Sequence, residues 1–232
     1  MRRVMYAVAG MLVSVGVLAS QPALGDDDDE RRRFEVTVTN LTRAQTFTPV
    51  LVASHREGVT LFALGQPASP QLAILAEEGD TAPLTALLLA TPGVRDVADS
   101  GAPPGGFVPP GQSKTVIVDA GRGARHLSVA AMLIPTNDGF FALNGERAPR
   151  GNEVLTYFSP AYDAGSERND ELCASIPGPS FAECGGPGGG GHPGGGEGYV
   201  HIHAGIHGIG NMTASARDWR NPVARITIRK IR

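Results

Sequence analysis

Glycine and proline limit the kinds of structure that this chain can form. Its 232 residues include 31 Gly and 18 Pro, together about a fifth of the total. Glycine is costly in the interior of a helix and proline breaks one, whereas both favour tight turns. The composition therefore predicts short elements joined by many turns and disfavours long helices.

Short stretches that alternate apolar and polar residues predict β-strands. Residues 34–41 alternate and are rich in β-branched side chains, and residues 223–231 alternate at the other end of the chain. Further strands are expected at residues 50–53, 114–118, 127–134, 140–143 and 199–206. This number of short strands at turn-rich spacing predicts a mainly β protein, an antiparallel β-sandwich.

Two segments depart from the strand pattern. Ser69-Pro70 predicts the start of a helix that Gly79 ends, and Asp80-Thr81 predicts the start of a second helix, so that a short helical insertion is expected here. Residues 185–198 contain 10 of the 31 glycines. We expect them to form a mobile glycine-rich loop that does not pack and whose removal leaves the fold intact.

The N-terminal residues have the features of an export signal. Arg2 and Arg3 precede an uncharged apolar run at residues 4–19, and residues 23–25 supply the small side chains expected before a cleavage site. The run is shorter than the roughly 18 to 20 residues that span a bilayer, so an uncleaved anchor is the less favoured alternative. We expect residues 1–25 to be a signal peptide.

The remaining chain is expected to be one exported domain in the periplasm or outside the cell. Residues 26–33 form a charged flexible leader, and residues 34–232 form the domain; no segment after the signal is expected to cross a membrane. The chain has 20 Lys and Arg against 23 Asp and Glu, a formal charge of −3. No basic block occurs beyond residues 31–33, which argues against nucleic acid as a partner.

Cys173 and Cys184 are the only cysteines of the sequence. In an oxidising compartment such a pair forms a disulfide by default, and the residues between them contain proline and glycine, as a pinned loop does. We therefore expect a Cys173–Cys184 disulfide.

Two expected turns carry carboxylates that suit a calcium ion. Asn137-Asp138-Gly139 follows one expected strand, and residues 162–167 place Asp163 and Glu167 four residues apart around a glycine. Calcium takes about six to eight oxygen ligands in flexible geometry, which loop carboxylates and backbone carbonyls can supply. Turns rich in Asp and Asn are also common without a metal, because these side chains bond to their own backbone. The turns alone leave both interpretations open.

Several stretches of the chain resemble the spondin N-terminal domain family, in the form found in exported single-domain bacterial proteins. The stretches are residues 34–42, 47–49, 134–140 and, above all, 162–167, and the resemblance extends over roughly residues 34–231. It implies a β-sandwich similar to C2 domains and calcium binding at the matching positions Asp138, Asp163 and Glu167. Glu167 stands where animal members have Asp, and Asn137 stands where they have Pro. These differences imply that longer side chains reach the metal and that they bind it more weakly.

The resemblance implies an exported, non-catalytic calcium-binding module. Its expected setting is a cell surface, a matrix or adhesion, and its expected partner is a protein, a glycan or a lipid surface. The motifs agree with a non-enzyme: the sequence has no Gly-x-Ser-x-Gly, and no Gly-Lys-Ser/Thr follows the glycine run.

A histidine group supports an alternative function. Along a strand at residues 199–206, His201 and His203 would share one face, where two imidazoles can bind Zn²⁺ or Cu²⁺ with His207 or Glu197 as a third ligand. The chain would then be a small exported transition-metal protein or metalloenzyme. A solvent-facing position for these histidines, without a metal, is the favoured interpretation.

We predict that cleavage after Gly25 and formation of the Cys173–Cys184 disulfide accompany export. The intact mass of the exported protein tests both halves, because it should match residues 26–232 less two hydrogens. A retained N-terminus would contradict the cleavage, and two free thiols titrated under denaturing conditions would contradict the disulfide.

Overall fold

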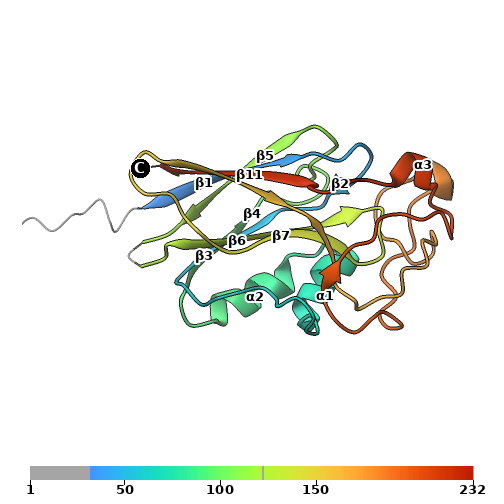
Figure 1. The fold of residues 1–232 in the computed structure, drawn as a ribbon, viewed down its shortest axis with the longest axis horizontal. Coiled ribbons are helices and arrows are strands. Elements are labelled where there is room, and N and C mark those ends of the chain that lie inside the picture. The colour runs from blue at the N-terminus through green and yellow to red at the C-terminus, as the bar shows by residue number, and fades with distance from the viewer. Residues whose placement is uncertain (1–31, 122, 232) are drawn as a thin grey trace, which may run out of the picture.

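The computed structural model describes residues 32–121 and 123–231 (Figure 1). The expected signal peptide, residues 1–25, and residues 26–31 of the expected leader lie outside the described residues. Of that leader, Arg33 already belongs to the first strand.

Two antiparallel sheets pack face to face, which confirms the predicted β-sandwich (Figure 1). In spatial order, one sheet consists of β5 (Ser113–Asp119), β1 (Arg33–Asn40), β11 (Ala224–Ile231) and β8 (Val154–Ser159). The other sheet runs β10 (His201–Ile202), β9 (Ala161–Asp163), β7 (Gly139–Arg147), β6 (His126–Ile134), β3 (Leu51–His55) and β4 (Val94–Asp99), and β2 (Thr46–Phe47) also pairs with β6. Most strands are short, as the glycine and proline content predicts.

The four-stranded sheet covers one face of the core and leaves its other face to solvent. Along β1, Phe34, Val36 and Val38 are buried and alternate with residues that are only partly buried, and Ile226 and Ile228 of β11 repeat the pattern. This alternation is what an antiparallel sheet with one wet face requires. The predicted strands at residues 34–41 and 223–231 are therefore confirmed.

The other sheet is covered on both faces. The core of the sandwich lies on one side, and α1 (Pro70–Glu78) and α2 (Ala82–Ala90) lie against the other, where Leu72, Leu75 and Leu84 join Phe140 in a second apolar cluster. β3 and nearly all of β6 are consequently buried along their whole length. This explains why both strands read as continuous apolar runs in the sequence.

The two helices begin and end where the sequence predicts. Ser69 caps α1, its hydroxyl accepting a hydrogen bond from the backbone N–H of Leu72, and Gly79 ends the helix at a φ of 70°. The Asp80 carboxylate accepts a hydrogen bond from the N–H of Ala82 at the start of α2. No helix within residues 32–121 and 123–231 has the length and apolar character needed to cross a membrane.

The expected strand at residues 199–206 is wrong in extent, since β10 contains two residues. Before it, the N–H of Val200 bonds to the carbonyl of Gln66 rather than to the sheet; after it, the N–H of Gly205 bonds back to the ring of His203. Both bonds remove the chain from the ladder. Four strands, β2, β4, β8 and β9, were not expected from the sequence, because they are short or only partly buried.

The predicted disulfide is confirmed, with Cys173 and Cys184 joined at an S–S distance of 1.99 Å. It lies in a long, largely irregular segment between β9 and β11, which contains a single 3-10 turn, Ala182–Cys184, and the short α3 (Ala214–Arg217). This segment gathers at one end of the sandwich (Figure 1).

The glycine-rich loop packs, so the expectation of a mobile, unpacked loop is wrong. The N–H groups of Gly189, Gly194 and Gly198 donate to backbone carbonyls of Cys173, Ser166 and Gly165, at 2.7 to 2.9 Å. The glycines serve close backbone approach rather than flexibility. A Cβ on Gly188 or Gly189 would lie 1.8 or 2.0 Å from a carbonyl oxygen.

We predict that Gly189→Ala destabilises the protein, because the new Cβ would overlap the carbonyl oxygen of Ala174. The expected loss is about 1–3 kcal/mol, or several degrees in Tm, measured by thermal denaturation. Gly186→Ala is the matched control, since a Cβ there has nothing within 4 Å. Equal melting of both variants would show that the loop is free after all.

Candidate metal centre

The register of three neighbouring strands brings the predicted site residues together. β9 lies between β7 and β10, and Asp163 is the partner of Gly139 on one side and of His201 on the other. Asp138 directly precedes Gly139 in the turn between β6 and β7. Carboxylates and imidazoles far apart in the sequence thus become neighbours at one end of the sheet.

Asp138 is completely buried and uses only one of its two oxygens. Its Oδ2 accepts hydrogen bonds from the N–H of Ser166 at 2.8 Å, the N–H of Glu167 at 3.0 Å and the Ser166 hydroxyl at 3.2 Å. Its Oδ1 is buried and has no hydrogen-bond partner. Asp138 therefore holds the 163–167 turn in place and still presents an open acceptor.

Asp163 contacts both groups of candidate ligands. Its Oδ1 accepts a hydrogen bond from the N–H of Gly165 at 2.8 Å and lies 3.4 Å from Nε2 of His201. Its Oδ2 accepts one from the Asn169 amide at 2.7 Å and lies 3.9 Å from Nε2 of His203. The calcium and histidine sites expected from the sequence are thus one connected cluster.

Like Asp138, Glu167 uses only one of its two carboxylate oxygens in a hydrogen bond. Its Oε1 accepts a hydrogen bond from the N–H of His192 in the glycine-rich loop at 2.9 Å, and its Oε2 is buried without a partner. Glu77, at the C-terminal end of α1, is a further buried carboxylate beside Glu167 and Asp138. Burial raises the pKa of Glu77, and the charge of Asp138 adds to this shift. Sequence reasoning missed Glu77, since nothing in a helix pattern indicates what faces its last turn.

Gly165 is required by the shape of the 163–167 turn. Its φ of 65° lies in the left-handed region, and a Cβ at this position would meet the carbonyl oxygen of Tyr199 at 2.3 Å. The glycine seen between the two acidic residues of the sequence motif is therefore needed for the backbone to turn under residue 199.

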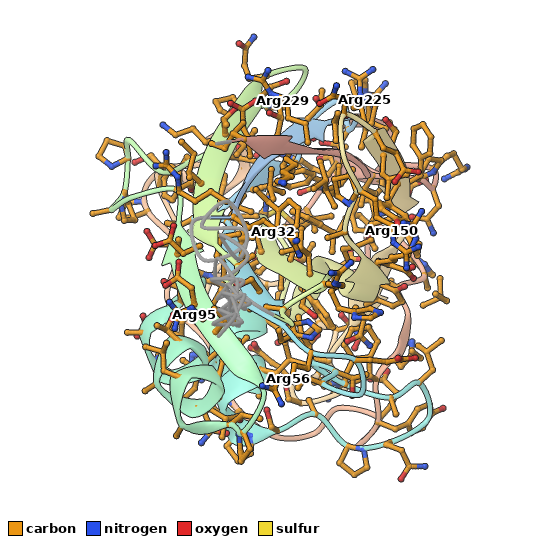
Figure 2. The ribbon with its side chains drawn as sticks, turned by 90° about the vertical axis from the view of Figure 1, so that its left-hand side faces the viewer. Arg32, Arg56, Arg95, Arg150, Arg225 and Arg229 are labelled. Atoms are coloured by element: carbon orange, nitrogen blue, oxygen red, sulfur yellow. A yellow bond between two sulfur atoms is a disulfide. The ribbon has the colours of Figure 1, made fainter. Side chains whose placement is uncertain are left out.

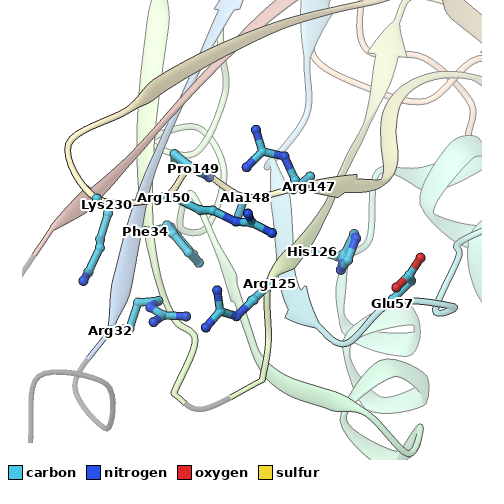
Figure 3. Close-up of a pocket in the computed structure, with 11 residues that line it drawn as sticks. Arg32, Phe34, Glu57, Arg125, His126, Arg147, Ala148, Pro149, Arg150 and Lys230 are labelled. Atoms are coloured by element: carbon cyan, nitrogen blue, oxygen red, sulfur yellow. The ribbon is translucent and has the colours of Figure 1, made fainter. Parts of the chain in front are cut away.

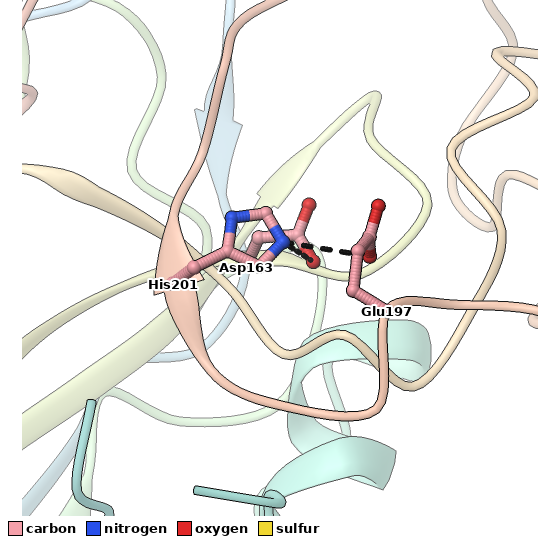
Figure 4. A group of neighbouring side chains, drawn as sticks. All are labelled: Asp163, Glu197 and His201. Carbon is pink, nitrogen blue, oxygen red and sulfur yellow. Dashed lines mark ion pairs between the residues drawn. The ribbon is translucent and has the colours of Figure 1, made fainter. Parts of the chain in front are cut away.

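Among the described residues, one group of three candidate ligands has all its ligand atoms within 4.8 Å of one another: Asp163, Glu197 and His201 (Figure 4). Nε2 of His201 lies 3.4 Å from both carboxylates. Nδ1 of His201 lies 3.0 Å from the carbonyl oxygen of Ile202, which can only accept, so Nδ1 donates and the neutral ring keeps its lone pair on Nε2. This is the usual arrangement of a metal-binding histidine.

His203 and His207 are placed differently from His201. His203 is buried beside the Trp219 ring and its Nδ1 accepts a hydrogen bond from the N–H of Gly205, so its neutral ring carries the proton on Nε2. His207 is exposed, with Nε2 3.3 Å from the carbonyl of Ala204. The favoured expectation of solvent-facing histidines is wrong for His203, because the Trp219 ring packs beside it and the side chain is buried.

Unpartnered polar atoms are concentrated in this cluster. Within the described residues, six buried side-chain nitrogen or oxygen atoms lack a hydrogen-bond partner, and four of them belong to Asp138, Glu167, His201 and His203. Such groups are rare in native proteins and commonly mark a site for an ion or a ligand.

Part of the β-sandwich matches a known family. Residues 38–146 match the family model Spondin_N. This part of the chain belongs to the spondin N-terminal domain family. No curated protein matches the chain. The matched residues include Asp138. The other candidate ligands come after the matched part of the chain: Asp163, Glu167, His201, His203 and His207. The family and the disulfide together indicate an exported protein.

Within residues 32–121 and 123–231, no Lys or Arg forms an ion pair with Asp138, Asp163 or Glu167. Burial, with the neighbouring Asp163 charge, raises the pKa of Asp138 to about 6. Burial also raises the pKa of Glu167 to about 7, and the Asp138 and Glu77 charges add to it. Burial lowers the pKa of His203 to about 4, so this ring is neutral at pH 7. A divalent cation would relieve this excess of buried negative charge.

The structure brings Asp138, Asp163 and Glu167 into one buried neighbourhood linked by hydrogen bonds and by their charges. Among the described residues, these three do not form a set with all ligand atoms within 4.8 Å. Calcium tolerates such spacing better than a transition metal does, because backbone carbonyls and waters complete its shell.

We predict that Glu167→Gln stabilises the protein at pH 7.5 in chelator, by about 1–3 kcal/mol, since it removes a buried charge. The folded pKa of Glu167 lies above its unfolded value, so ionisation lowers stability as the pH rises from about 4 to about 7. The stabilisation should therefore shrink at pH 5, as measured by urea denaturation. Both proteins contain His203, so its titration contributes equally to their stabilities and cancels in the difference between them. A variant that is less stable at both pH values would contradict a buried, uncompensated Glu167.

Proposed function

We propose that this chain is an exported, non-catalytic module that binds calcium through Asp138, Asp163 and Glu167. The observation that carries the proposal is the pair of buried, unpartnered oxygens, Asp138 Oδ1 and Glu167 Oε2, on carboxylates that form no ion pair with a Lys or Arg of the described residues. Two unpaired carboxylate oxygens away from water are unfavourable unless a cation binds them.

The donor set favours calcium over a catalytic use of the carboxylates. All three side chains are at most 1% exposed, so an ion can enter the cluster but a substrate has little access to it. The ligands are oxygens on turns, which suits the variable coordination of calcium. The resemblance of residues 134–140 and 162–167 to calcium-binding members of the family supports the same choice.

Calcium would join three parts of the chain. The turn before β7, the end of β9 and the glycine-rich loop all meet at Asp138, Asp163 and Glu167. An ion here orders the surface loops at this end of the sandwich. We propose that these loops contact a protein, glycan or lipid surface in a cell-surface, matrix or adhesion setting.

The group of Asp163, Glu197 and His201 supports a second candidate, a transition-metal site. Nε2 of His201 offers a lone pair between two carboxylates, and zinc or copper accepts such a nitrogen and oxygen set. His203 does not add a nitrogen in its present hydrogen bonding. The two candidate sites share Asp163, so a substitution there cannot distinguish them.

We predict that calcium raises Tm progressively with the logarithm of its concentration, and stabilises the protein by about 2.7 kcal/mol at a hundredfold excess over Kd. Magnesium should do less, because it dehydrates reluctantly and demands regular geometry. Asp138→Asn should abolish most of the calcium response, while His201→Ala should leave it unchanged, as measured by differential scanning calorimetry after chelation.

The metal itself can be identified by elemental analysis of protein purified without a His tag. The main proposal is supported if the purified protein contains calcium, if Asp138→Asn loses that calcium, and if His201→Ala keeps it. Zinc or copper that is lost in His201→Ala and kept in Asp138→Asn would replace it with the histidine site.

A further inference from the structure

The end of the sandwich opposite the metal centre is rich in arginine. Figure 2 looks onto this end and shows Arg32, Arg56, Arg95 and Arg150 distributed around it. β7 connects the two ends, because it starts beside Asp138 and finishes at Arg147. Nine residues of strand place the two regions about 27 Å apart. The basic end is therefore independent of the metal centre and of the function proposed for it.

A pocket of about 450 Å³ opens at this basic end, where strands of both sheets end (Figure 3). Its charged lining comes from five basic side chains and one acidic one: Arg32, Arg125, Arg147, Arg150, Lys230 and Glu57. The apolar part of the lining includes Phe34 and Pro149. In Figure 3, the side chains of Arg32, Arg125 and Arg150 extend towards the space beside Phe34.

Two of these basic side chains, Arg125 and Arg150, are not balanced by carboxylates of the described residues. Arg147 is paired with Glu153, at 3.2 Å. Arg125 and Arg150 are exposed and, within residues 32–121 and 123–231, neither forms an ion pair of its side chain with a carboxylate. Partial burial, together with the charge of Arg125, lowers the pKa of Arg32, so these two like charges are held close together.

We propose that this pocket binds closely spaced acidic groups, as presented by a small organic anion with two or more carboxylate, sulfate or phosphate groups. Its volume lies in the range of small-molecule sites. Guanidinium groups converging from different strands suit such groups, because each can donate two parallel hydrogen bonds to an oxyanion. The Phe34 and Pro149 surface adds contact for a carbon skeleton.

The same chemistry could come from the chain itself. Residues 26–30 are four Asp and one Glu, and they end two residues before Arg32 in the sequence. A tethered acidic segment has a high effective concentration at a nearby site. The test therefore includes an arm that neutralises this segment.

The probe is benzene-1,3,5-tricarboxylate, titrated into the full exported chain by calorimetry at low salt. The pocket variant is Arg125→Gln with Arg150→Gln. The control is Arg56→Gln with Arg95→Gln, which removes the same charge from the same end but outside the pocket lining. A further protein carries Asn or Gln at residues 26–30. All four substituted arginines are exposed, so the fold should be preserved, and Tm verifies this.

A free anion is supported as the ligand if the unaltered chain binds the probe and two further results hold. The affinity should fall at least about tenfold in the pocket variant and less than about threefold in the control. Binding that appears only after residues 26–30 are neutralised, and is again lost with the pocket substitutions, assigns the pocket to the chain's own acidic segment. No binding in either background, or equal weakening in pocket variant and control, overturns the proposal.

Discussion

The position of Asp163 between two strands is the constraint on which the metal centre depends. In the ladder it faces Gly139 of β7 and His201 of β10, and its own carboxylate holds the turn that follows through the N–H of Gly165. Because strand register is set by backbone hydrogen bonds, the neighbouring carboxylates and imidazoles cannot separate without breaking the sheet edge. The cluster thus keeps its buried charges together even though they repel.

The helical insertion makes this arrangement possible. α1 and α2 cover the outer face of the larger sheet, so β7 is buried on both sides over most of its length. The same cover brings Glu77 to the cluster and removes water from Asp138. Burial without a basic partner is what raises the pKa of these carboxylates, and it gives a cation a larger advantage here than at an exposed acidic turn.

Charge is distributed unequally along the molecule. The turns at one end of β7 gather carboxylates, whereas the opposite end gathers arginines around a pocket. The net charge of −3 conceals this separation. An antiparallel sandwich favours it, because strands that run in opposite directions place residues from distant parts of the sequence at the same end. The two ends can therefore carry different binding chemistry on one rigid scaffold.

The sequence by itself determined the fold class, the helix limits and the disulfide. Alternation in β1 and β11, the Ser69 cap, the Gly79 end and the lone cysteine pair are local signals, and local backbone and solvent preferences are enough to interpret them. The Asp163-Ala164-Gly165 sequence of the 163–167 turn also indicated Asp163 and Glu167 as candidate ligands. Only the tertiary structure decided that Glu77 joins them, that His203 is buried beside Trp219, and that the glycine-rich loop packs by backbone contact. It also decided that five basic residues in or next to the ends of different strands line one pocket. These features depend on which segments meet in space, and hydrogen bonds and burial between residues far apart in the chain leave no periodic pattern in the sequence.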